Sequence, residues 1–85
     1  MDLFINVINK MAKVIKTYYD NGQLEEEYFE NDGKIEGEYK KYFENGQLRI
    51  ICNFVNGKKE GEFKSYHENG RVKTEVYASM ITLIK

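Results

Sequence analysis

Hydrophobic and polar residues alternate along much of the chain. The clearest run is Leu48, Ile50, Cys52 and Phe54, which share one parity. A period of two is typical of β-strands that bury one face. The alternation therefore predicts a mainly β fold of about six strands, each of ordinary length. We expect them near residues 14–20, 24–30, 36–43, 48–55, 61–67 and 72–78.

A repeat of about 24 residues links these strands. Tyr18–Leu24 recurs as Tyr42–Leu48 and, with more substitutions, as Tyr66–Val72. A second motif, Asp32–Lys40, recurs as Asn56–Lys64. Equivalent positions lie two strands apart in such an array, so their side chains are expected to stack in ladders. Stacked units can then build a core that no single unit could form alone.

Each unit contains two turns, both marked by a glycine that follows Asn or Asp. These dipeptides favour tight hairpins, because a type I′ turn requires φ > 0 at both central residues. We therefore expect an antiparallel meander of β-hairpins. Gly37 and Gly61 fall inside expected strands, where glycine often marks a β-bulge or a close backbone approach. The expected structural turns are at Gly22, Gly33, Gly46, Gly57 and Gly70.

The two ends of the chain follow other patterns. Apolar residues at helical spacing begin at Phe4, Val7, Ile8 and Met11, which predicts a short amphipathic cap helix over residues 1–13. Its apolar stripe must be buried, by the sheet, a second copy, a partner groove or a membrane surface. The chain is expected to be a single domain over 1–85, with the hairpin repeats at 14–78 and a short apolar C-terminal cap at 79–85.

Composition narrows the possible partners. The formal net charge is −1, which argues against nucleic-acid binding, because nucleic-acid binders usually carry a basic surplus. A membrane surface is also disfavoured, since only Lys10, Lys13 and Lys16 supply positive charge near the expected helix. Cys52 is the single cysteine, and neither a secretory signal nor a membrane-spanning run is recognisable. We therefore expect a cytoplasmic protein.

Candidate chemistry is sparse. Adjacent strand residues face opposite ways, so the acidic run at 25–27 is not expected to converge on a metal ion. His67 is the only histidine and takes the position that Tyr19 and Phe43 hold in the other units. Cys52 is expected to act as a small buried hydrophobic residue. We expect no enzyme activity, metal or cofactor. The candidate partner contacts are Glu25, Glu26, Glu27, Tyr19, Phe43 and His67.

The motifs at Tyr42–Leu48 and Asn56–Gly61 resemble those of the MORN-repeat variant family, and the resemblance spans roughly residues 14–77. It implies β-hairpins in an elongated, twisted sheet, with no agreed catalytic residues. Bacterial members are often labelled as antitoxins. The implied function is a non-enzymatic protein-binding module, in the form of an antitoxin-like or phage-type inhibitor of a bacterial effector or nuclease. The alternatives are a structural scaffold, a homodimerisation repeat or a peripheral lipid binder.

Overall fold

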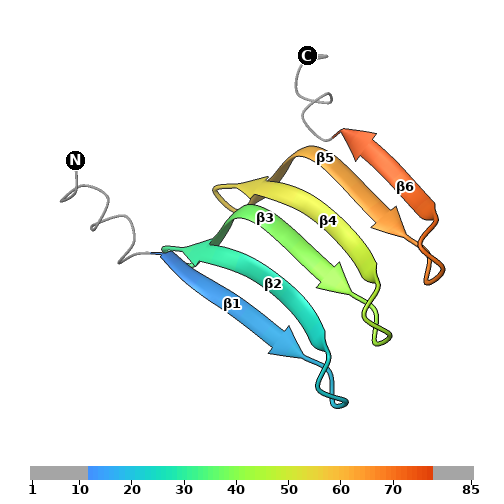
Figure 1. The fold of residues 1–85 in the computed structure, drawn as a ribbon. Helices are drawn as coiled ribbons and strands as arrows, with labels where there is room; N and C mark the ends of the chain where they lie inside the picture. Colours follow the sequence, from blue (N-terminus) through green and yellow to red (C-terminus); the bar gives the residue numbers. More distant parts are fainter. Residues whose placement is uncertain (1–11, 78–85) are drawn as a thin grey trace, which may run out of the picture.

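The computed structural model describes residues 12–77, which form one antiparallel sheet of six strands. Each strand pairs with its neighbours in sequence, so the chain is a simple meander (Figure 1). The predicted mainly β meander with a 24-residue period is confirmed, and the strand limits differ from those predicted by only a few residues. The strands are β1 (Ala12–Tyr18), β2 (Leu24–Asn31), β3 (Lys34–Tyr42), β4 (Leu48–Val55), β5 (Lys58–Tyr66) and β6 (Val72–Tyr77).

The predicted cap helix over 1–13 overlaps the described chain only at Ala12 and Lys13. Both belong to β1 and pair with the end of β2, so the helix prediction is wrong for these two residues. The physical reason is that β2 offers backbone hydrogen-bonding partners as far as Ala12, whereas a helix of about a dozen residues is only marginally stable in water. The rest of the predicted helix and the C-terminal cap at 79–85 lie outside the described residues.

Two of the five turns match the predicted geometry. Asp32 and Gly33 connect β2 to β3 with φ values of 53° and 79°. Asn56 and Gly57 connect β4 to β5 with φ values of 54° and 83°. Positive φ at both central residues is the property of a type I′ turn, whose twist matches that of the flanking strands. Both turns lie at the same end of the strands (Figure 1).

The three turns at the opposite end of the strands differ from the predicted type I′. In the first, the Gly22 N–H donates to the Tyr19 carbonyl at 3.0 Å, and the Tyr19 N–H donates to the Gln23 carbonyl at 2.9 Å. Of the turn residues, only Gly22 has positive φ, as in a type I turn followed by a left-handed glycine. The side-chain oxygen of Asn21 accepts from the Gln23 N–H at 2.9 Å. Asparagine therefore acts through its side chain here, and Asn45 and Asn69 do the same.

The glycine inside β3 marks a β-bulge, which confirms that prediction. Tyr28 of β2 pairs with Tyr39, whereas the next residue, Phe29, pairs with Glu36, so β3 contains extra residues at this point. Gly37 has a φ of 87°, and a Cβ placed there would meet nothing within 4 Å. The need for glycine therefore comes from the backbone angle and not from a close approach. Gly61 repeats the arrangement in β5.

The described sheet is a single layer. One row of directly paired side chains crosses all six strands. It contains Ile15, Tyr39 and Phe63, which are equivalent positions of the 24-residue repeat, as expected of a ladder. Within the described range, Cys52 at the centre of the row is the only buried hydrophobic side chain, at 5% exposure. The core is therefore a band within one sheet. Residues 12–77 include no helix that is long and apolar enough to cross a membrane. The row is Ile15, Tyr28, Tyr39, Cys52, Phe63 and Val76.

Candidate functional site

One side of the sheet carries this row together with its neighbours from β2 to β5. These side chains surround a hollow of about 330 Å³. Most of the side chains on this surface are aromatic or aliphatic, and a few charged side chains lie among them and at the margins. We call this surface the aromatic face. Its residues are Glu26, Tyr28, Ile35, Tyr39, Lys41, Ile50, Cys52, Phe54, Lys59 and Phe63.

Tyr39 is the centre of the aromatic face. Its ring lies 5.4 Å from the Tyr28 ring, tilted by 33°, and 5.9 Å from the Phe54 ring in an edge-to-face arrangement. Such geometries add stabilisation beyond the area that the rings bury. The Tyr39 hydroxyl donates to Glu26 Oε2 at 2.6 Å, and the Thr17 hydroxyl donates to Glu26 Oε1 at 3.1 Å. These contacts hold Glu26 and Tyr39 in fixed orientations.

The ionisation of these groups follows from their surroundings. Burial raises the pKa of Tyr39, and the hydrogen bond and charge of Glu26 raise it further. Burial also raises the pKa of the Cys52 thiol, with Lys59 opposing the shift. Both groups are therefore neutral near pH 7. A neutral, buried thiol is a poor nucleophile, which agrees with the predicted packing role of Cys52.

A lysine covers one margin of the aromatic face. Lys59 Nζ lies 4.7 Å from the centre of the Phe63 ring, within the range of a cation–π contact. Phe63 pairs with Cys52 across the β4–β5 ladder. An apolar surface with cationic groups at its margin is suited to a partner that supplies apolar side chains and a few acceptors.

The opposite side of the sheet is more polar. A second row of paired residues runs across the six strands, and we call it the charged row: Lys16, Glu27, Lys40, Ile51, Lys64 and Glu75. Lys16 and Glu27 form an ion pair at 3.8 Å, and Lys64 and Glu75 form another at 3.6 Å. Exposed pairs of this kind add little stability, and the strand register sets the order of charges across the sheet.

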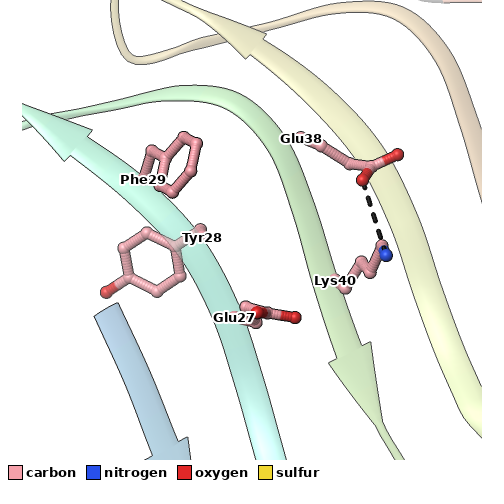
Figure 2. A pocket seen from close by; sticks show the side chains of 5 residues that line it. All are labelled: Glu27, Tyr28, Phe29, Glu38 and Lys40. Atoms are coloured by element: carbon pink, nitrogen blue, oxygen red, sulfur yellow. Dashed lines mark ion pairs between the residues drawn. The ribbon is translucent and has the colours of Figure 1, made fainter. Parts of the chain in front are cut away.

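The polar side also contains a small hollow, of about 160 Å³. Figure 2 shows its lining, with Phe29 on β2 and the ion pair between Lys40 and Glu38, whose atoms lie 3.6 Å apart. Glu62 and Glu75 raise the pKa of Lys64 in the same row. Several charged side chains of this surface are paired with neighbouring charged groups, and exposed apolar side chains such as Phe29 lie among them.

The acidic residues at 25–27 are divided between the two sides, as the strand alternation predicted. Glu26 bonds to groups on the aromatic face, while Glu27 contacts Lys16 in the charged row. The register shifts between Thr17 and Tyr18, which leaves Glu25 without a residue opposite it in β1. Within residues 12–77, no group of three His, Cys, Asp or Glu side chains is placed to hold a metal ion.

The other predicted contacts are Tyr19, Phe43 and His67. Each immediately precedes a three-residue turn, so all three lie at the same end of the strands. The Tyr19 hydroxyl donates to the Tyr42 carbonyl at 2.5 Å. The Arg49 guanidinium lies 5.3 Å from the centre of the Phe43 ring. Tyr19 and Phe43 are half-buried, whereas His67 is exposed. The first two thus have clear structural roles. The aromatic-face residues Tyr28, Phe54 and Phe63 were not among the predicted contacts, although strand parity places Phe54 beside Cys52.

The turns at this end of the strands allow a direct test of how neighbouring turns stabilise one another. Tyr19→Phe is expected to lower the free energy of unfolding by about 1 kcal/mol, because the Tyr42 carbonyl loses its side-chain donor. Phe43 occupies the equivalent position one repeat later and lacks a hydroxyl. Phe43→Tyr is therefore expected to gain up to about 1 kcal/mol by donating to the Tyr66 carbonyl. Urea unfolding of both variants measures the effect, and equal stability of all three proteins would contradict it.

Comparison with known proteins agrees with the geometry. A family model described as a MORN repeat variant matches residues 13–31, 35–56 and 59–78. Each match covers most of one hairpin, β1–β2, β3–β4 or β5–β6, so the sequence repeat and the structural repeat coincide. No curated protein and no solved structure gave a match.

Proposed function

Because the chain belongs to the MORN repeat variant family, whose repeats are generally protein- or membrane-binding modules, we propose that it is a non-enzymatic module that binds another protein through the aromatic face. The observation that carries the proposal is a single-layer sheet whose apolar side has no second layer among residues 12–77. Sheets ordinarily bury such a side against another element. A partner protein bound to the aromatic face would supply such a layer.

The residues of the aromatic face have the character of an interface. Aromatic side chains are enriched in the centres of protein interfaces, where they bury a large area with few rotatable bonds. Tyr39 and Phe54 are held in place by ring contacts before any partner arrives, so little entropy is lost when they bind. Lys41 and Lys59 supply polar groups at the margin. The favoured contact is thus the aromatic face and not the turn end of the strands, where Tyr19, Phe43 and His67 lie.

The finer form of the proposal is inhibition of a bacterial effector or nuclease in the cytoplasm, in the manner of an antitoxin or phage inhibitor. Its basis is that bacterial members of the family that the repeat motifs resemble are often labelled as antitoxins. A toxic effector held on the aromatic face would be blocked by occupation alone, with no chemistry required of this chain. Growth of cells that express the captured effector, with and without this chain, tests that form directly.

Binding through the aromatic face is tested with two matched phenylalanine variants. Phe63→Ser removes an aromatic ring from the face, whereas Phe29→Ser removes an exposed ring from the opposite side. A protein captured from native lysate is identified by mass spectrometry, purified and titrated against each variant. Phe63→Ser is expected to weaken binding at least about tenfold, and Phe29→Ser to leave it nearly unchanged.

Two controls complete the test. Thermal unfolding of both variants shows whether each is folded at the titration temperature, and Lys59→Glu alters the same face without removing a ring. Equal binding by Phe63→Ser, Lys59→Glu and the parent would show that the aromatic face is not the contact. Co-sedimentation of the chain with liposomes of anionic phospholipid, without any protein partner, would instead favour a membrane-binding role.

A further inference from the structure

The two outer strands of the sheet each leave one backbone edge without a partner strand in the described part of the chain. β1 pairs only with β2, and β6 pairs only with β5. All six residues of β6 are exposed, and none of them is proline or glycine. Free edges of this kind are templates for adding a further strand. The question is which strand fits them, and the repeat itself supplies a register.

The 24-residue period makes the two edges complementary. Tyr28, Cys52 and Val76 are equivalent positions on the even-numbered strands. Inside the sheet, Tyr28 of β2 pairs with Tyr39 of β3, and Cys52 of β4 pairs with Phe63 of β5. The residue of β1 equivalent to Tyr39 and Phe63 is Ile15. The same register, continued once more, sets Val76 of one copy opposite Ile15 of another.

We propose that the edge strand β6 of one copy pairs antiparallel with the edge strand β1 of a second copy, so that copies join head to tail into one continuous sheet. This assembly is separate from the partner binding proposed above, because it uses the backbone edges and leaves the aromatic face open. The strand directions are compatible with a meander, because β6 of one copy and β1 of the next would run antiparallel, as β2 and β3 do. The row of paired apolar side chains would then run unbroken from one copy into the next.

Charge supports this pairing. In the same register, Glu75 of one copy lies opposite Lys16 of the next, just as Glu27 lies opposite Lys40 inside the sheet. The charged row begins with a lysine on β1 and ends with a glutamate on β6. Opposite charges directly across a ladder stabilise a strand pair, and like charges destabilise it. Val76 would meet Ile15, and Thr74 would meet Thr17, which are favourable β-branched pairs.

The mode of assembly has a recognisable signature. A head-to-tail contact uses two different surfaces, so each added copy presents a fresh edge and growth does not stop at a dimer. The mean mass measured by sedimentation equilibrium is therefore expected to rise steadily with concentration. The contact is a single strand pair, so self-association is expected to be weak and to decrease as salt screens Lys16 and Glu75.

Charge reversal provides the decisive experiment. Lys16→Glu and Glu75→Lys are each expected to weaken self-association about fivefold, because each places like charges across the proposed contact. Mixing the two variants in equal amounts is expected to restore association, since each unaltered edge then meets its complement. Lys34→Glu, at an exposed site in the turn region of β3, is the matched control and is expected to have no effect.

Other results would overturn the proposal. Loss of association in Glu75→Lys but not in Lys16→Glu would indicate that β6 pairs with itself in a two-fold dimer. The reverse result would indicate pairing between two copies of β1. A mixture of the two variants that stays monomeric, while the parent associates, would exclude the head-to-tail contact. A parent protein that remains monomeric at every concentration would also exclude it.

Discussion

Replacing Tyr39 with alanine is expected to lower the free energy of unfolding by about 3 kcal/mol, the lower end of the range for aromatic truncations in protein cores. The side chain contacts Tyr28 and Phe54 through its ring and Glu26 through its hydroxyl. The substitution removes all three contacts at once. Small domains have only about 5–15 kcal/mol of stability in total, so the loss is a large fraction. Urea unfolding followed by circular dichroism measures it.

Two further variants separate the causes of that loss. Tyr39→Phe keeps the ring and removes only the hydrogen bond to the Glu26 carboxylate, so a loss of about 1.5 kcal/mol is expected. Tyr77→Ala truncates a tyrosine that is 54% exposed on the outer strand, and a loss below about 1 kcal/mol is expected. If Tyr39→Ala were no more destabilising than Tyr77→Ala, the row of paired side chains that contains Tyr39 would not be the core of the sheet.

The sequence alone was sufficient to predict the strands because two independent signals agree on them. Alternation at Ile50, Cys52 and Phe54 indicates a half-buried strand, and the phase of the turn glycines places its ends. The period of 24 residues then requires equivalent strands to occur again. Local and long-range features point to the same fold, which is the condition under which a pattern is a reliable guide.

The turn types could not be predicted from the same dipeptides. Asp32-Gly33 spans a two-residue turn, whereas Asn21-Gly22 forms the end of a three-residue turn. Asparagine can occupy the left-handed region itself, or it can accept a hydrogen bond from the backbone two residues later. Both uses place the same residue before glycine. The strand ends decide between them, and strand ends are set by pairing across the sheet.

The limits of parity explain what was missed in the candidate site. Parity places Leu48 with Ile50, but the register shifts between Lys41 and Tyr42, so Leu48 pairs with Tyr42 at the strand end. The predicted helix failed at Ala12 for a similar reason, since a few apolar residues fit either period. Parity did separate Glu26 from Glu27. It does not reveal that the sheet has no second layer among residues 12–77, because layering depends on how all the strands are arranged and not on one strand.

Substituting valine for Gly37 is expected to cost about 2–3 kcal/mol of unfolding free energy. The residue has a φ of 87°, a region that branched side chains almost never occupy. Open space around the position means that no clash adds to the cost, so the whole effect comes from the backbone. Asparagine tolerates positive φ far better, and Gly37→Asn, with a similar side-chain size, is expected to lose only about 1 kcal/mol.

The same substitution connects backbone strain to the aromatic face. The bulge at Gly37 is the point at which β3 shifts its register, leaving Tyr39 opposite Tyr28. A chain that relieved the strain by removing the bulge would move Tyr39 relative to β2 and separate the two rings. Gly37→Val is therefore expected to weaken partner binding as well as stability, with changed amide shifts at Tyr28 and Tyr39 in NMR spectra. Equal stability of the valine and asparagine variants would show instead that the bulge does not depend on the left-handed backbone of this residue.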